Sequence, residues 1–172
     1  QPEMEALYYA VNTKLTEELA DKAKAERVRQ FVFLSTMSVY GMTMGQITEE
    51  TECTPITFYG KSKLAAERYL CEQRSDTFKV VIRPPMIYGK ACTGNYASLE
   101  KLAGKIPVFP RVSNERSMIY IENLCEFLYR IIRGDADGIY CPQNSQYVNT
   151  SDMVARIAES YGRSIWLVPG FE

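Results

Sequence analysis

The chain has 172 residues, of which 46% are hydrophobic and 24% charged, a composition typical of a folded globular domain with its own core. A formal net charge of −1 offers no basic field for nucleic acid, and no apolar run approaches the ~18 residues of a membrane helix, so we expect a cytoplasmic protein without nucleic-acid or membrane partners. Histidine is absent, which excludes Ser-His-Asp and Cys-His nucleophile systems and removes the commonest metal ligand, but leaves proton transfer by a tyrosine open.

The first predicted elements are a long helix and a buried strand. Glu3 to about Val28 is rich in Ala, Leu, Glu and Lys and forms an amphipathic pattern. Its apolar positions recur every four residues at Leu7, Val11, Leu15, Leu19 and Ala23. Phe31 to Leu34 is a continuous apolar run of β-formers, which predicts a strand buried on both faces. Ser35 and Thr36 follow it, where open α/β sheets place their sites.

A second helix is predicted from Thr57 to about Arg74, after an irregular loop from Gly41 to Pro55 whose acidic Glu49–Glu52 cluster indicates solvated surface rather than a metal site. Tyr59 and Lys63 share one face of this helix, because they are four residues apart. A nearby ammonium and a place in the first helical turn both favour phenolate. We therefore expect a lowered Tyr59 pKa and a general acid/base role for this residue.

A further strand is predicted at Phe78–Ile82, which gives an order of helix, strand, loop, helix and strand. That order favours a parallel sheet with right-handed crossovers. Arg83-Pro84-Pro85 follows, and two prolines cannot continue a central strand, so the chain must leave the sheet there.

Three motifs in this order carry a family resemblance: Ser-Thr-x-x-Val-Tyr-Gly at 35–41, Tyr-Gly-Lys-Ser-Lys at 59–63 and Arg-Pro-Pro-Met-Ile-Tyr-Gly at 83–89. Together they resemble the extended short-chain dehydrogenase/reductases, specifically the NAD-dependent nucleotide-sugar epimerases and dehydratases, and most of all the UDP-hexose 4-epimerases. The resemblance implies an α/β fold: the later part of a Rossmann-like, doubly wound parallel sheet, with a small substrate-binding portion. It implies that 1–85 is the end of the dinucleotide-binding domain and that 86–172 binds substrate.

The resemblance also implies roles for individual residues. Thr36, Tyr59 and Lys63 would be catalytic. The residues that contact NAD would be Asn12, Ser35, Tyr59, Lys63 and Pro84. Asn12 and Thr16 resemble the family's Asn-x-x-x-Thr pattern, although a surface asparagine is the alternative.

For a nucleotide-sugar substrate, the resemblance implies contacts from Met86, Asn95, Phe109 and Arg116. Many relatives carry asparagine at the position of Met86, and Met86 cannot make the same hydrogen bond. Phe109 is equally expected as a core residue, since aromatic side chains bury well without a ligand. Arg116 matches an arginine that clamps the diphosphate, a task that suits its planar fork, and a surface salt bridge is the alternative.

The rest of the chain predicts a short helix over 95–104, a strand over 106–109, and a helix over 122–133 with Leu124, Phe127, Leu128, Ile131 and Ile132 facing the core. A strand at 138–142, a helix at 152–161 capped by Thr150 or Ser151 and stopped by Gly162, and a strand at 165–168 complete it. Five cysteines without a Cys-x-x-Cys pair favour free buried thiols over a zinc or disulfide site.

A dinucleotide site of this kind needs a glycine-rich turn, and none of the 10 glycines forms Gly-x-Gly-x-x-Gly or Gly-x-x-Gly-x-x-Gly. We therefore expect a chain truncated at its N-terminus and inactive by itself. Two other functions stay open: an NADPH-dependent carbonyl or sugar reductase, and a non-catalytic nucleotide-sugar binder. An exposed edge of the parallel sheet favours self-association, so we expect a homo-oligomer.

Overall fold

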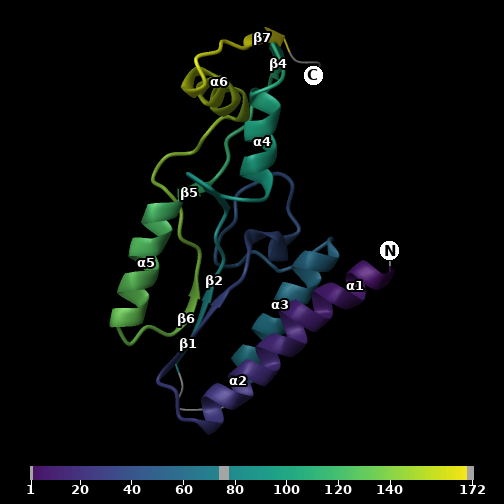
Figure 1. Ribbon diagram of the computed structural model, residues 1–172. Coiled ribbons are helices and arrows are strands. Elements are labelled where there is room, and N and C mark those ends of the chain that lie inside the picture. Colours follow the sequence, from purple (N-terminus) through teal and green to yellow (C-terminus); the bar gives the residue numbers. More distant parts are fainter. Residues whose placement is uncertain (1, 74–77, 170–172) are drawn as a thin grey trace. The chain divides into compact units, whose positions relative to one another are not determined.

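The computed structural model describes residues 2–73 and 78–169 (Figure 1). The chain forms two compact units. The first combines Gln1–Pro84 with Leu128–Pro142, and the second combines Pro85–Phe127 with Gln143–Glu172. The chain therefore leaves the first unit after Pro84, between the two prolines of the Arg-Pro-Pro motif. It returns to the first unit for residues 128–142. The division predicted from the sequence had assigned these residues to the substrate-binding region, 86–172.

The first unit is built on a three-stranded parallel sheet of β1 (Gln30–Leu34), β2 (Phe78–Ile82) and β6 (Gly138–Tyr140), in the order β1-β2-β6. The predicted parallel α/β arrangement is thereby confirmed. The expected burial of β1 on both faces is wrong, because only one of its residues is buried and neighbouring side chains on its two faces differ in exposure. Phe33 is buried, but Leu34 is 44% exposed.

The first helix forms as predicted, in three consecutive segments: α1 (Pro2–Tyr8), the π-helical η1 (Tyr9–Lys14) and α2 (Leu15–Ala25). Four of its five predicted apolar positions, all except Ala23, do not face the core. Met4, Leu7, Val11, Leu15 and Leu19, here called the apolar stripe, are each 46–58% exposed. Thr13, Thr16 and Ala23 are buried instead, because small side chains let this helix approach its neighbour closely.

That neighbour is α3 (Phe58–Glu72), which runs beside the first helix (Figure 1). The helix begins near the predicted Thr57, which caps it with its Oγ1 accepting from the Gly60 N–H at 3.0 Å. Leu70 packs with Phe33 of β1 and Val81 of β2. The predicted last residue of the helix, Arg74, lies outside the described residues.

Between β1 and α3, a 3-10 turn that the sequence analysis did not predict, η2 (Met37–Tyr40), precedes the predicted irregular loop. Gly41 ends this turn in a left-handed conformation with φ +67°. Glu49, Glu50 and Glu52 of the loop are exposed, in agreement with the prediction of a solvated surface.

The second unit contains two parallel strand pairs, β3 (Met86–Tyr88) with β5 (Met118–Tyr120) and β4 (Val108–Arg111) with β7 (Trp166–Pro169). The helices α4 (Asn95–Ala103) and α6 (Thr150–Ser160) pack with them, and α5 (Ile121–Arg133) continues into the first unit. The core of the second unit consists of Ala103, Met118, Met153, Val154 and Ile157.

Three details of this region differ from the sequence prediction. The cap of α6 is Asn149, whose Oδ1 accepts from the N–H groups of Ser151 and Asp152, so the helix begins earlier than expected. Ile132 of α5 is 54% exposed rather than buried. β4 begins at Val108, two residues later than the predicted start at Ile106.

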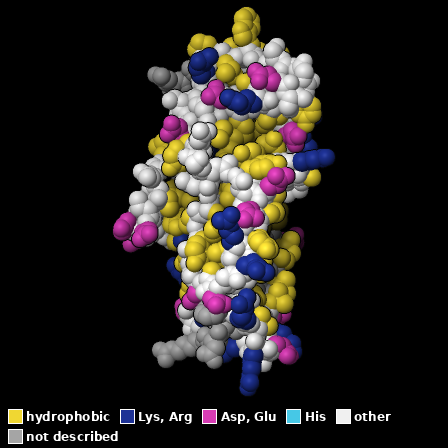
Figure 2. All heavy atoms as spheres, turned by 90° about the vertical axis from the view of Figure 1, so that its left-hand side faces the viewer, with side chains coloured by type: hydrophobic (Ala, Val, Ile, Leu, Met, Phe, Trp, Pro, Cys, Tyr) yellow, Lys and Arg dark blue, Asp and Glu magenta, His cyan; other side chains and the backbone are white. Residues whose placement is uncertain are grey.

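The surface carries charges of both signs, and Figure 2 shows Lys and Arg interspersed with Asp and Glu on the face that it presents. All five cysteines are free, as expected, but none is buried: Cys53 and Cys92 are partly exposed and the other three are exposed. Within 2–73 and 78–169, no three Cys, Asp or Glu side chains gather closely enough to hold a metal ion. No helix in these ranges combines the length and apolarity needed to cross a membrane.

Candidate functional site

The carboxyl end of β1 brings Thr36 and Tyr59 together. Backbone hydrogen bonds from Ser35 N to Ile82 O, at 2.7 Å, and from Met37 N to Pro84 O, at 3.2 Å, hold this segment against the end of β2. Thr36 is extended and caps η2, its Oγ1 accepting from Ser38 N at 3.1 Å. The Thr36 hydroxyl donates to Ser38 Oγ at 3.2 Å. The Thr36 side chain also acts on the phenol of Tyr59, in the first turn of α3, in the direction that lowers its pKa.

Lys63 reaches the same strand end from the next turn of α3. Its Nζ donates to the backbone carbonyl of Leu34 at 2.9 Å and lies 4.7 Å from the centre of the Phe33 ring. The three residues expected to be catalytic are therefore all anchored at the last residue of β1 or immediately after it.

The electrostatics of this cluster differ from the sequence expectation. Burial raises the pKa of the Tyr59 phenol, the interaction with Thr36 opposes this rise, and Tyr8 adds to it. Burial also lowers the pKa of Lys63, although the negative charge of Glu67 acts to raise it. The expected lowering of the Tyr59 pKa is thus wrong for this structure, because desolvation of the phenol outweighs the groups that favour phenolate.

Asn12 connects the first helix with the turn of α3 that carries Tyr59. Its Nδ2 donates to Ser62 Oγ at 3.0 Å, and Ser62 Oγ donates to the Tyr59 carbonyl at 2.9 Å. Thr13 Oγ1 donates to the Ser62 carbonyl at 2.8 Å. Asn12 is partly exposed and hydrogen-bonded within the chain, and its contact with a cofactor stays a prediction. Ser62 is completely buried, and the sequence analysis did not single it out, although it stands inside the Tyr-Gly-Lys-Ser-Lys motif.

Ser35 and Pro84 are buried at the same strand ends. The Oγ of Ser35 has no hydrogen-bond partner among the described residues. Buried hydroxyls are normally paired, so an orphaned hydroxyl at the carboxyl end of a parallel sheet fits a polar ligand that approaches from outside the chain. These residues fit the dinucleotide that the sequence motifs imply.

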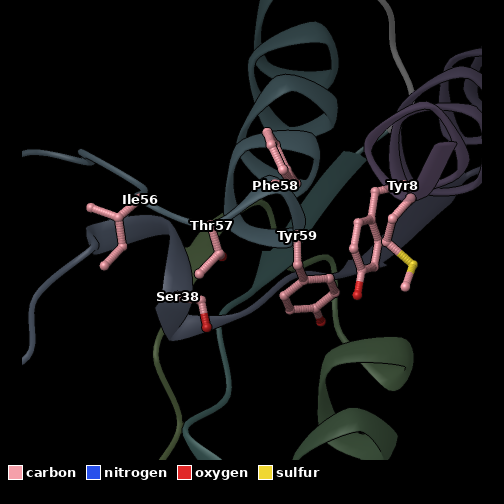
Figure 3. Close-up of a pocket in the computed structure, with 7 residues that line it drawn as sticks. Tyr8, Ser38, Ile56, Thr57, Phe58 and Tyr59 are labelled. Atoms are coloured by element: carbon pink, nitrogen blue, oxygen red, sulfur yellow. The ribbon is translucent and has the colours of Figure 1, made fainter. Parts of the chain in front are cut away.

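A cavity of about 540 Å³ opens beside Tyr59 (Figure 3). Its lining residues are Met4, Tyr8, Ser38, Ile56, Thr57, Phe58 and Tyr59. The rings of Tyr8 and Tyr59 meet edge to face with centroids 5.8 Å apart. Figure 3 shows the hydroxyls of Tyr8, Ser38 and Tyr59 pointing to the same side. Sequence reasoning missed Tyr8 and Ser38; Ser38 stands in the first motif, whereas only the packing of α1 on α3 brings Tyr8 here.

The four residues expected to contact substrate all belong to the second unit. Met86 on β3 and Phe109 on β4 pack against the core of this unit, which supports the packing role considered for Phe109. Asn95 is the exposed first residue of α4. Arg116 has an exposed side chain, and its backbone pairs with that of Val148.

Two curated proteins are similar to this chain in sequence. UDP-glucose 4-epimerase of Vibrio cholerae is 31% identical over 95% of this chain and 53% of its own length. An N-acetyl-alpha-D-glucosaminyl-diphospho-ditrans,octacis-undecaprenol 4-epimerase of Escherichia coli O157:H7 is 31% identical over 93% of this chain and 51% of its own length. The chain thus spans about half the length of these curated relatives.

Solved structures share the fold. The dTDP-4-dehydrorhamnose reductase of Bacillus anthracis in complex with NADP superposes with a TM-score of 0.81 at 20% identity, over 97% of this chain and 59% of that one. The Bordetella bronchiseptica enzyme WbmG in complex with NAD and UDP gives a TM-score of 0.80 at 19% identity, over 99% and 57%.

The chain also matches a protein family as a whole. Residues 2–141 match the NAD dependent epimerase/dehydratase family. This range contains β1, α3 and the Thr36, Tyr59 and Lys63 cluster that they position. The chain therefore belongs to the NAD-dependent epimerase/dehydratase family.

Proposed function

We propose that this chain is the proton-transfer part of an NAD-dependent nucleotide-sugar epimerase or dehydratase, most similar to the UDP-hexose 4-epimerases. The observation that carries the proposal is the convergence of three groups at the carboxyl end of β1. Lys63 Nζ donates to the last carbonyl of that strand at 2.9 Å, and Thr36, just after the strand, acts on the pKa of the Tyr59 phenol. The name of the Vibrio cholerae relative supports a UDP-hexose as the substrate class.

In this proposal, Tyr59 exchanges a proton with a sugar hydroxyl that Thr36 holds by hydrogen bonding. Bound NAD would supply the hydride acceptor. Lys63 holds the cofactor ribose, and Asn12, Ser35 and Pro84 complete the cofactor side. Tyr59 would act as general base, taking the hydroxyl proton while the sugar loses hydride, and as general acid when the hydride returns. Burial raises the pKa of the phenol and so favours its acid form, and Thr36 opposes this rise.

On the substrate side, the proposal keeps Arg116 as the residue that binds the diphosphate and Asn95 as a contact for substrate phosphate. Both side chains are exposed and therefore accessible to a ligand. Met86 and Phe109 remain proposed contacts, although both also pack against the core of the second unit.

The test uses a chimera, because the chain contains no glycine-rich dinucleotide turn. The amino-terminal part of the Vibrio cholerae relative is joined to residues 2–172 of this chain. We expect the chimera to interconvert UDP-glucose and UDP-galactose without consuming added NADPH. The chain alone is the control, for which we propose no turnover and no NAD binding detectable by calorimetry. A chimera that folds and retains NAD but converts no nucleotide sugar would contradict the proposed activity.

A reductase is the second candidate, favoured by the structural similarity to the Bacillus anthracis reductase in complex with NADP. Reductase activity would consume NADPH in step with loss of a carbonyl substrate, whereas an epimerase returns its hydride to the same sugar. The third candidate, a non-catalytic nucleotide-sugar binder, predicts heat of UDP-sugar binding to the chimera without turnover. Nucleotide-sugar turnover, NADPH consumption and heat of binding, measured on the same chimera, therefore separate the three candidate functions.

We also propose a homo-oligomer, supported by the apolar stripe on α1, η1 and α2. Exposed apolar area of this kind favours association, so wild-type chain should give a dimer mass in light scattering. Replacing Leu15 and Leu19 by lysine should give a monomer with unchanged circular dichroism. Leu102→Lys is the control, since Leu102 is exposed on the second unit. A wild-type chain that stays monomeric at high concentration would contradict the proposal.

The remaining proposal concerns the compartment. We propose the cytoplasm, which the five free cysteines support, because thiols stay reduced there.

A further inference from the structure

A buried ion pair lies behind the candidate site and takes no part in the proposed proton transfer. Arg83, the residue after β2, forms a bidentate ion pair with the carboxylate of Glu67 on α3. Its Nη2 is 2.5 Å from Oε2, and its Nε is 3.1 and 3.2 Å from the two carboxylate oxygens. The side chains are only 9% and 2% exposed.

Arg83 also reaches a third segment of the chain. Its Nη1 donates to the Tyr40 hydroxyl at 2.8 Å, and its guanidinium carbon lies 4.9 Å from the centre of the Tyr40 ring. Tyr40 is the buried last residue of η2, the turn that Thr36 caps. Burial alone would lower the pKa of Arg83, but Glu67 raises it, so the guanidinium stays charged.

The position of Glu67 on α3 connects this pair to the site. Tyr59, Lys63 and Glu67 are spaced by four residues and lie on one helix face. One end of that face meets Thr36, the middle meets the Leu34 carbonyl, and the other end is held by Arg83. The charge of Glu67 also acts on Lys63 directly, favouring its ammonium form.

Stability alone does not account for such a pair. Desolvation of two charges offsets most of their attraction, and well-packed hydrophobic replacements of buried ion pairs are often as stable or more stable. Directional contacts of a planar guanidinium do what apolar packing cannot: they fix the rotation and translation of one element relative to another.

We propose that Glu67, Arg83 and Tyr40 are positioning residues, which lock the face of α3 that carries Tyr59 and Lys63 to the η2 turn that carries Thr36. Arg83 is the centre of this lock, because it is the residue that contacts both α3 and η2. The kinetic consequence rests on the function proposed above, whereas the geometric consequence for Lys63 does not.

The first test replaces the pair by apolar residues, Glu67→Leu with Arg83→Met. In the chimera we expect kcat to fall by at least about tenfold with little change in KM, since a small misplacement of reacting groups is costly. The urea midpoint of the chain should stay near that of wild type. A stable double variant with wild-type kcat would show that the pair is merely structural and would overturn the proposal.

The second test uses two changes that leave the side-chain volume nearly unaltered, Glu67→Gln and Tyr40→Phe. The Lys63 side chain is followed in the chain itself by NMR titration of its Cε–Hε resonances, assigned with Lys63→Arg. We expect Lys63 to titrate at lower pH in Glu67→Gln and to show shifted resonances in Tyr40→Phe. Unchanged Lys63 signals in both variants would overturn the proposal even if the chimera has no activity.

Glu26→Gln is the matched control, because it makes the same substitution in the exposed pair of Lys22 and Glu26. It should change neither kcat nor the Lys63 signals. A Glu26→Gln effect as large as that of Glu67→Gln would show that the response is not specific to the buried pair, and would equally overturn the proposal.

Discussion

Replacing Tyr59 by phenylalanine is expected to lower kcat of the chimera by roughly 10²–10⁴-fold, the usual contribution of a positioned general acid or base. The substitution removes only the phenol hydroxyl, the group on which Thr36 acts. KM for the nucleotide sugar should change much less, because the diphosphate is proposed to bind elsewhere, at Arg116. The measurement is a steady-state assay of UDP-galactose conversion.

The fold should tolerate this change. Phenylalanine retains the ring that meets Tyr8 edge to face at 5.8 Å, so the variant should keep the urea midpoint of wild type. Tyr161→Phe is the matched control: it also removes one phenol hydroxyl, which here bonds with Glu100 of the second unit at 2.6 Å, and it should leave kcat unchanged. Near-normal turnover of Tyr59→Phe would remove Tyr59 from the mechanism.

Replacing Gly41 by alanine is expected to cause the largest loss of stability that a single methyl group can produce near the site. Gly41 has φ +67°, a conformation that costs a residue with a Cβ about 1–2 kcal/mol. A Cβ there would lie 2.0 Å from the Thr54 carbonyl oxygen, which is backbone and cannot rotate away. Overpacking of this kind adds about 1–3 kcal/mol. The free energy of unfolding, measured in urea by circular dichroism, should fall accordingly.

The variant Gly162→Ala separates the cost of the left-handed backbone conformation from the cost of the steric clash. Gly162 has nearly the same backbone angle, φ +69°, but no atom lies within 4 Å of its ideal Cβ position. Its substitution should therefore show only the conformational part of the loss. Equal losses at Gly41 and Gly162 would mean that the close approach of η2 to the loop before α3 does not contribute.

The sequence by itself predicted the main helices and strands of the first unit and the cluster of Thr36, Tyr59 and Lys63 at the end of β1. Phe31–Leu34 and Phe78–Ile82 form neighbouring parallel strands as predicted, because apolar runs of β-formers are specified locally. Thr57 and Tyr59 begin a helix because the Thr57 hydroxyl caps it. The three motifs indicated the family, which the match over residues 2–141 confirms.

Only the tertiary structure decided which faces are covered and which charges are paired. The apolar stripe has the periodicity of a core-facing helix, yet it is exposed, because burial depends on which neighbour lies over a face. The upward shift of the Tyr59 pKa likewise follows from desolvation of the phenol, which residue spacing does not encode. Arg83 and Glu67 are 16 residues apart in the chain, and they pair because a parallel crossover places α3 against the end of β2. Local sequence specifies elements and cappings through short-range sterics, whereas solvent exposure and long-range pairing exist only after those elements have packed.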